Sequence, residues 1–219
     1  MKIPVLAGPT ASGKTALSLE LAGNYPLEVI SADAMMVYRQ SDIGTAKPTV
    51  LEREQVPHHL IDIADPNTDF SVTEWVTAAE AAIAGVLERD RIPLIVGGTG
   101  FYIRALSQGL PSAPPSDPVA MQRLEVELRN QGLDAMIAEL EVASPSDAER
   151  TQRNPRRVLR ALEILRGTGR APATFEPRAP RYSFEKFVLL PDKALLETRI
   201  AARTSAMLMG GLQIGRAHV

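Results

Sequence analysis

The chain has 219 residues, of which 45% are hydrophobic and 23% charged, a composition typical of a folded domain with a real core. It contains no cysteine, so disulfide bonds and cysteine-ligated zinc are excluded. No stretch resembles a secretory signal or a membrane span, and we expect a cytoplasmic protein that does not contact a membrane. The net charge of −2 does not predict a polyanion-binding protein.

The first predicted element is a buried strand over residues 3–7, which leads directly into GPTASGKT at residues 8–15. A helix is predicted over residues 14–23. A G-x-x-x-x-G-K-[ST] segment between a strand and a helix is typical of a loop whose backbone N–H groups hold phosphates. Here Lys14 supplies a positive charge, and the Thr15 hydroxyl is placed to bind Mg²⁺. The predicted phosphate-binding residues are Gly8, Pro9, Thr10, Ala11, Ser12, Gly13, Lys14 and Thr15.

Strands and helices continue to alternate along the chain. Strands are predicted over residues 27–31, 92–96 and 184–190, and helices over 72–89 and 100–107. This alternation predicts an α/β fold, namely a parallel sheet flanked by helices as in P-loop NTPases. Asp33 follows the second strand, at the sheet edge where folds of this type place their active sites.

The region between residues 111 and 154 breaks this alternation. A proline-rich boundary at residues 111–118 is followed by a helical pattern over 119–142 without a strand signal. We therefore predict a small helical insert at residues 112–154. The α/β core is predicted to be discontinuous and to comprise residues 1–111 and 155–212.

An arginine-rich segment follows the predicted insert. Residues 150–181 contain nine arginines and only two acidic residues, and residues 155–167 read as a helix with proline at its start and glycine at its end. Helical spacing places Arg156, Arg157 and Arg160 opposite an apolar face. Such a surface is either a solvated helix face or a phosphate-binding edge for nucleic acid.

Six segments, in order, resemble the bacterial tRNA dimethylallyltransferase family, and the resemblance extends from residue 3 to about residue 212. The segments are GPTASGKT (8–15), DAMMVYR (33–39), DIGTAKP (42–48), PHHLID (57–62), GGTGFY (97–102) and NPRRVLRALEI (154–164). The resemblance implies that the phosphate loop binds dimethylallyl diphosphate with Mg²⁺. The acceptor would be N6 of the adenosine on the 3′ side of the tRNA anticodon.

The resemblance also assigns roles to residues. Asp33 would be the general base, Lys14 would stabilise the departing diphosphate, and Thr10 and Thr99 would help to hold Asp33 and the base. Arg203 would lie near the phosphates. The implied tRNA-binding residues are Asp33, Ala34, Met35, Met36, Thr99, Arg156, Arg157, Val158, Leu159 and Arg160. We expect a monomer whose partners are tRNA, through its anticodon loop, and dimethylallyl diphosphate.

The chain departs from the family pattern in two places. The family usually has serine and often glutamine where this chain has Ala34 and Met36, which removes hydrogen bonds to RNA. Family members also continue well past residue 212, and we interpret residues 213–219 as a non-native tail on a truncated chain.

Several histidine and aromatic side chains, and two other functions, offer alternatives to this interpretation. His58 and His59 are predicted to be structural rather than metal ligands, and Trp75, Tyr38 and Tyr102 to pack in the core or at its edge rather than to stack on bases. A P-loop small-molecule or nucleotide kinase shares the loop, the fold and a helical lid, although the arginine-rich segment argues against it. An inactive, RNA-binding fragment is the other alternative.

Overall fold

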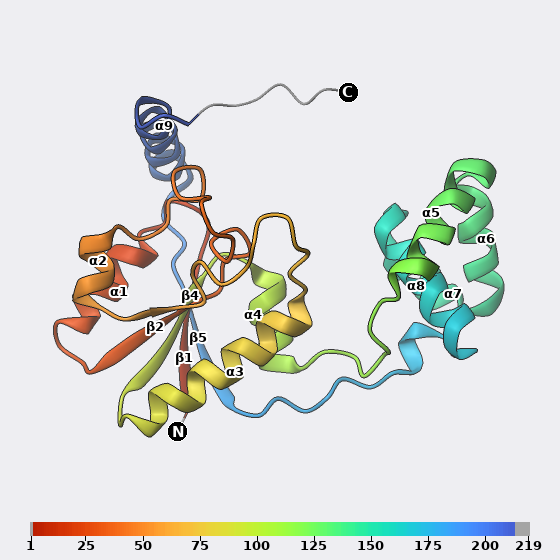
Figure 1. The fold of residues 1–219 in the computed structure, drawn as a ribbon, viewed down its shortest axis with the longest axis horizontal. Coiled ribbons are helices and arrows are strands. Elements are labelled where there is room, and N and C mark those ends of the chain that lie inside the picture. Colours follow the sequence, from red (N-terminus) through yellow and green to blue (C-terminus); the bar gives the residue numbers. More distant parts are fainter. Residues whose placement is uncertain (1, 213–219) are drawn as a thin grey trace. The chain divides into compact units, whose positions relative to one another are not determined.

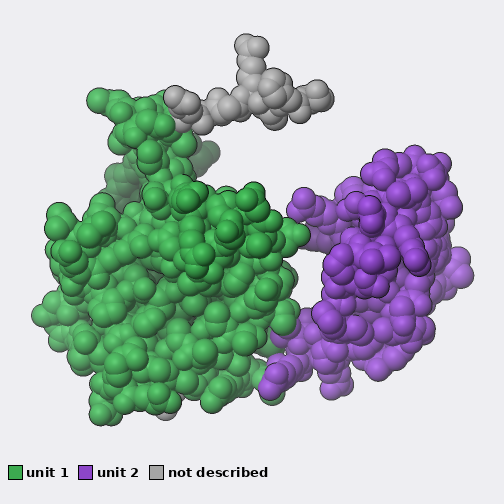
Figure 2. Space-filling view, in the orientation of Figure 1, with its two compact units in different colours: residues 1–109, 179–219 green, residues 110–178 purple. Residues whose placement is uncertain are grey.

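The computed structural model describes residues 2–212, so the predicted tail at 213–219 lies outside the described residues. The chain divides into two compact units, coloured separately in Figure 2. Unit 1 comprises residues 1–109 and 179–219, and unit 2 comprises residues 110–178.

Unit 1 is built on a parallel five-stranded sheet (Figure 1). The strand order is β3-β2-β4-β1-β5, and each neighbouring pair is parallel. The strands are β1 (Lys2–Ala7), β2 (Leu27–Ser31), β3 (His58–His59), β4 (Ile92–Gly97) and β5 (Ser183–Val188). The predicted α/β class and its four strands are confirmed, and β3 is an additional strand of only two residues.

Helices pack on both faces of the sheet. The helices of unit 1 are α1 (Lys14–Ala22), α2 (Val50–Gln55), α3 (Val72–Glu88), α4 (Gly100–Gln108) and α9 (Lys193–Met209). On one face, Trp75 and Ile83 of α3 and Ile103 of α4 are buried in one cluster with Ile30 and Ile95 of the sheet. The opposite face carries a second cluster, to which leucines of α1 contribute. Burial on both faces explains why β1 and β4 read as nearly continuous apolar runs.

The aromatic and histidine side chains singled out in the sequence have structural contacts. Trp75 is fully buried, its ring stacks on Tyr102 at 4.6 Å, and its indole N–H donates to the Ser31 carbonyl at 3.1 Å. Tyr38 packs against the same core. The His58 ring bonds the Val56 carbonyl, and His59 bonds Glu28. The predicted packing roles of these aromatic side chains are confirmed.

Unit 2 is a helical unit with its own core. Its helices are α5 (Pro118–Gln131), α6 (Leu133–Ala143), α7 (Pro145–Thr151) and α8 (Pro155–Thr168), followed by the 3₁₀ turn η1 (Pro172–Thr174). Leu124, Met136 and Leu140 pack there with Val158 and Leu162. Our prediction assigned residues 155–178 to the α/β core, and the structure corrects it. Helix α8 belongs to the helical unit because α5, α6 and α7 cover its apolar face.

The two ends of unit 2 are joined to each other. The N–H of Ser112 donates to the Glu176 carbonyl at 3.0 Å, and the N–H of Arg178 donates to the Leu110 carbonyl at 2.9 Å. The incoming segment is also fastened to α8, where the buried Glu163 accepts from the Ser116 hydroxyl at 2.8 Å. The insert therefore leaves and rejoins unit 1 through paired segments. Within residues 2–212, no helix is long and apolar enough to cross a bilayer.

Candidate active site

The loop between β1 and α1 has the geometry of a phosphate-binding loop. It turns into α1 at Gly13, whose φ of 96° lies in the left-handed region that favours glycine. The N–H groups of the first turn of α1 are then available to an anion. The Lys14 ammonium folds back over the loop and donates to the carbonyls of Gly8 at 2.9 Å and Pro9 at 2.8 Å. Burial lowers the pKa of Lys14, Asp33 opposes that shift, and Arg203 adds to it.

Asp33 lies just beyond the end of β2 and is half-buried. Its Oδ1 accepts from the backbone N–H groups of Met35 at 2.9 Å and Met36 at 3.3 Å. Among residues 2–212, no hydrogen bond engages its Oδ2. One carboxylate oxygen therefore fixes the orientation of the side chain, while the other can accept a proton from a ligand.

The turn after β4 holds the backbone on both sides of Asp33. A Cβ on Gly97 would lie 2.1 Å from the Ala32 carbonyl oxygen, so only glycine allows this approach. The N–H of Thr99 donates to Ala32 O at 3.1 Å, and the Thr99 hydroxyl accepts from Ala34 N at 3.0 Å. Thr99 thus bonds the backbone on both sides of Asp33 and does not contact the carboxylate itself.

A cavity of about 370 Å³ brings these groups together. Its polar lining includes the phosphate loop from Thr10 to Thr15, Asp33 and Arg203. Its apolar lining includes Val29, Met36, Pro48, Ile61 and Val96. We call it the loop cavity. Phosphate-binding groups beside apolar side chains suit a phosphorylated ligand with a short hydrocarbon part.

A second cavity of about 680 Å³ adjoins the same residues. It is lined by Met35, residues 40–45, Gly211 and Leu212, and it shares Thr10 and Asp33 with the loop cavity. We call it the outer cavity. Since Asp33 lines both cavities, ligands bound in the two cavities can meet at its carboxylate.

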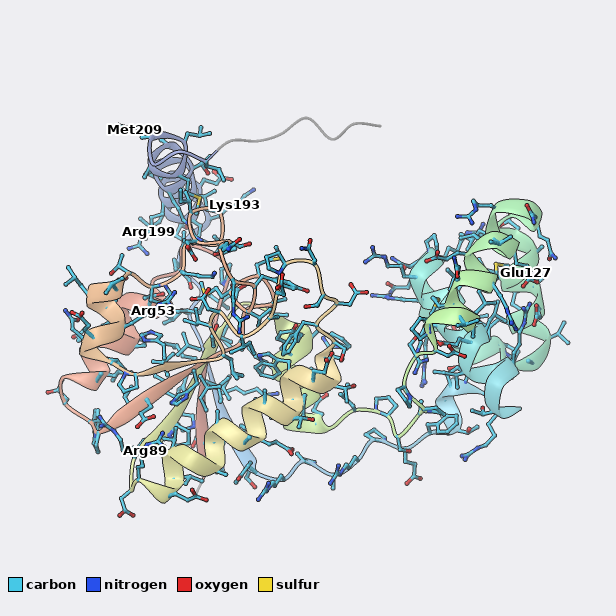
Figure 3. The ribbon with its side chains drawn as sticks, in the orientation of Figure 1. Arg53, Arg89, Glu127, Lys193, Arg199 and Met209 are labelled. Carbon is cyan, nitrogen blue, oxygen red and sulfur yellow. The ribbon has the colours of Figure 1, made fainter. Side chains whose placement is uncertain are left out.

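Helix α9 contributes two arginines to the loop cavity. Arg203 was expected near the phosphates, and it lines this cavity and donates from Nη2 to the Thr45 carbonyl at 3.3 Å. Arg199 also lines the cavity, and it was not predicted (Figure 3). The two arginines are four residues apart and therefore share one face of the helix. This R-x-x-x-R spacing was the signal that sequence analysis missed.

Known proteins are similar to this chain over most of its length. A family model described as IPP transferase matches residues 36–214, and one described as isopentenyl transferase matches residues 1–64. A tRNA dimethylallyltransferase of Deinococcus radiodurans is 53% identical over 95% of this chain and 68% of its own length. One of Thermus thermophilus is 55% identical over 96% of this chain and 70% of its own length. The chain belongs to the tRNA dimethylallyltransferase family.

Solved structures of this family have the same fold. The tRNA isopentenylpyrophosphate transferase of Bacillus halodurans is 37% identical, with a TM-score of 0.63 over 96% of this chain and 67% of its own. A eukaryotic dimethylallyltransferase acting on tRNA is 28% identical, with a TM-score of 0.79 over 96% of this chain and 53% of its own. The predicted P-loop NTPase-like class of the fold agrees with these neighbours.

The structure separates the expected tRNA-binding residues into two groups. Ala34, Met35 and Met36 directly follow Asp33. Met35 is exposed and lines the outer cavity, whereas Met36 lines the loop cavity. Val158 and Leu159 are 0% and 4% exposed in the core of unit 2. Their predicted contact with tRNA is therefore wrong for their side chains, because the apolar face of α8 is used for packing.

The arginines of α8 differ in whether the protein itself pairs their charge. Arg160 forms an ion pair with the buried Glu163 and a hydrogen bond with the Pro114 carbonyl, so it fastens the incoming segment to α8. Arg156 and Arg157 are exposed, and Arg157 donates to the Gln152 side chain at 3.0 Å. The expected RNA-facing role is compatible with Arg156 and Arg157 and is not supported for Arg160.

The oxygen ligands in the loop cavity fit Mg²⁺. Thr15 and Asp33 both line this cavity, and Mg²⁺ commonly takes one or two protein oxygens together with substrate phosphates. Over residues 2–212 there is no group of three or more His, Cys, Asp or Glu side chains that could hold a metal ion by itself. A magnesium ion here would therefore depend on the phosphates of the ligand.

Proposed function

We propose that this chain transfers the dimethylallyl group of dimethylallyl diphosphate to N6 of the adenosine on the 3′ side of the tRNA anticodon. The observation that carries this proposal is the position of Asp33, which lines both the loop cavity and the outer cavity. A diphosphate in the loop cavity and an adenine in the outer cavity would meet at this carboxylate. Membership of the family supports the same reaction.

The residues of the loop cavity stabilise the leaving group. As the allylic C–O bond breaks, its electron pair remains on the diphosphate, which gains negative charge. Lys14, the N–H groups at the start of α1 and Arg203 lie where that charge develops. A bound Mg²⁺, held by Thr15 and the phosphates, would neutralise part of the same charge.

Asp33 handles the proton of the acceptor. When N6 forms its bond to C1 of the dimethylallyl group, one N6 proton must leave, and Oδ2 of Asp33 can accept it. The bonds from Met35 and Met36 to Oδ1 keep this carboxylate in place. The adenine must leave its stack to reach Asp33, and an unstacked loop nucleotide can do so at moderate cost.

The cavities also bear on the alternative functions. The lining of the loop cavity favours a prenyl donor, because beside the phosphate loop the cavity continues into apolar side chains such as Val29 and Ile61. These side chains suit a five-carbon group. No observation in residues 2–212 favours a kinase or an inactive remnant. We also propose that the chain acts as a monomer, and in the cytoplasm because tRNA is its substrate.

A single incubation tests this function. Unmodified tRNA, labelled dimethylallyl diphosphate and Mg²⁺ are mixed with the 219-residue chain, and label in nucleosides of digested tRNA is measured. We expect label on the adenosine next to the anticodon. A parallel incubation replaces the prenyl donor with γ-labelled ATP and small-molecule acceptors. Label transfer from ATP without label on tRNA would contradict the proposal and favour a kinase.

A further inference from the structure

Lys47 carries a buried charge close to the site without lining it. Its side chain is 2% exposed, and its ammonium donates to Tyr38 O at 2.6 Å, Asp42 Oδ1 at 2.8 Å and Asp62 Oδ1 at 2.6 Å. These three bonds use all three N–H groups of the ammonium. A buried ammonium is tolerated only when it is paired in this way. The three acceptors are therefore held close to one another around the Lys47 ammonium.

The acceptors of Lys47 come from three different segments. Tyr38 belongs to the chain that follows Asp33, Asp42 to the turn at residues 41–46, and Asp62 to the chain after β3. Asp62 also accepts from Arg53 Nη1 at 2.8 Å, and Arg53 is labelled in Figure 3. Burial pushes the pKa of Asp62 upwards, but the hydrogen bonds from Lys47 and Arg53 outweigh it and hold the pKa below its ordinary value.

The backbone around Lys47 is held in an unfavourable conformation. Gln40, Ala46 and Asp62 have φ values of 61°, 48° and 59°, in the left-handed region that non-glycine residues seldom occupy. Such residues cost energy and persist where surrounding contacts over-determine them, often at ligand-binding segments. The three bonds of Lys47 are contacts of this kind, because they join the segments that contain these residues.

The turn at residues 41–46 also contacts Arg203, which lines the loop cavity. The Thr45 carbonyl accepts from Arg203 Nη2 at 3.3 Å, and Ala46 lines the loop cavity itself. The other side of the turn lines the outer cavity. Lys47 lines neither cavity, so any effect it has on a ligand must pass through the turn.

We propose that Lys47 is a positioning residue for diphosphate binding. Its ammonium fixes the turn at residues 41–46, and the Thr45 carbonyl of that turn holds the Arg203 guanidinium toward the phosphates. This inference rests on the proposed function, because it takes the ligand of the loop cavity to be a diphosphate. A through-space effect of the Lys47 charge is the competing explanation, and it predicts a different sign for one variant.

The test measures binding of inorganic pyrophosphate with Mg²⁺ to the 219-residue chain by calorimetry. For Lys47→Met we expect about a tenfold or greater loss of affinity, since misplacing a binding group by about 1 Å has effects of this size. For Asp42→Ala, whose side chain is 66% exposed, we expect about a threefold to tenfold loss without loss of folding, as the turn is released. A charge effect predicts tighter binding for Asp42→Ala, because a negative charge is removed. Asp42→Asn keeps an acceptor oxygen and should restore most of the affinity.

A matched control breaks a different ion pair, in which the carboxylate is buried and the arginine is exposed. Arg89 donates from Nη2 to the buried Glu28 at 2.7 Å, and neither residue lines the loop cavity or the outer cavity. Arg89→Met should lower the melting temperature and leave pyrophosphate affinity unchanged. Wild-type affinity in folded Lys47→Met, tighter binding in Asp42→Ala, or no pyrophosphate binding by the wild type overturns the inference.

The same measurements separate this inference from the proposed function. If the wild type binds pyrophosphate and the variants lose affinity as expected, but tRNA is not prenylated, the proposed function fails and the role of Lys47 stands. If tRNA is prenylated and Lys47→Met binds pyrophosphate and turns over normally, the inference alone fails. A selective rise of KM for dimethylallyl diphosphate, with KM for tRNA unchanged, supports positioning over general loss of structure.

Discussion

The phosphate loop and helix α8 both carry conspicuous positive charge, but the structure uses that charge differently. In the loop, Lys14 lies in a cavity together with Asp33 and Arg203. In α8, Arg160 is paired with Glu163, and Arg166 with Glu127 and Glu139. Much of the charge on α8 therefore holds unit 2 together. A count of arginines in a sequence does not distinguish charges that are free to bind a ligand from charges that are neutralised by the protein.

The largest effect is expected in the loop, from Lys14→Ala. Under the proposed function, the variant removes a charge that stabilises the departing diphosphate, which should cost about 3 kcal/mol in the transition state, or roughly 10²-fold in kcat/KM. Steady-state kinetics of tRNA prenylation measures it. An exposed lysine on β5 is the control, and Lys186→Ala should behave as the wild type. Normal kinetics for Lys14→Ala would remove the loop from the mechanism.

Asp33→Asn should have an effect of similar or slightly smaller size. The amide has nearly the same shape and can still accept at Oδ1, but it cannot take the N6 proton. We expect kcat to fall by about 10²-fold while tRNA affinity changes little. Single-turnover kinetics and a tRNA-binding assay separate these quantities. Weaker tRNA binding with an intact chemical step would make Asp33 an RNA-positioning residue.

In α8 the comparison can be made between two neighbouring arginines. Arg157→Glu should weaken tRNA binding roughly tenfold at low salt. It should also reduce the slope of log affinity against log salt concentration by the amount expected for the loss of about one phosphate contact or more. Arg160→Ala should leave the salt slope nearly unchanged. It should instead destabilise unit 2 by about 1–3 kcal/mol, since the buried Glu163 loses an ionic partner. Filter binding over a salt series, with thermal unfolding in parallel, checks both. Equal changes of slope would show that Arg160 also faces RNA.

The smallest effect concerns acid stability. Hydrogen bonds from Arg89, against the effect of burial, lower the pKa of Glu28 below 4.5. Since the folded state favours the charged form, this group stabilises the fold above about pH 4.5, and the contribution is lost as pH falls through the lowered pKa. Thermal unfolding between about pH 3 and pH 7 should show a weaker acid dependence in Glu28→Gln than in the wild type. In unit 2, Glu127→Gln should change little, because the Glu127 side chain is more exposed than that of Glu28. A larger effect at Glu127 would contradict this ranking.

Sequence patterns predict those parts of the molecule whose structure depends on neighbouring residues. The phosphate loop is defined within eight residues, and β1 and β4 are nearly all apolar. In contrast, β3 has only two residues and forms because His58 and His59 pair with Val29 and Ile30 of β2. Helix α9 was not predicted, because it buries no residue fully and has no strong apolar face. Its Arg199 was missed with it.

The errors in unit 2 have a similar cause. The predicted insert ended at residue 154, but the apolar face of α8, which begins at Pro155, packs against α5 and α6. The hydrogen bond from Arg160 to the Pro114 carbonyl was not predicted, because the two residues are 46 positions apart in the sequence. Partners at such separations are set by tertiary packing and leave no local pattern.

The paired ends of unit 2 have a consequence for how the chain folds. Strand β1, which is made first, pairs with β5 in the register Lys2 to Ser183, so the sheet closes across nearly the whole chain. Long closures of this kind slow folding, because chain entropy is lost before contacts form. Unit 2 has its own core. Once this unit has folded, the bonds between Leu110 and Arg178 and between Ser112 and Glu176 shorten the length of flexible chain between β1 and β5. We therefore expect the helical unit to fold first and to bring β5 to β1. Pulse-labelled hydrogen exchange should then show protection of α8 amides before those of β5.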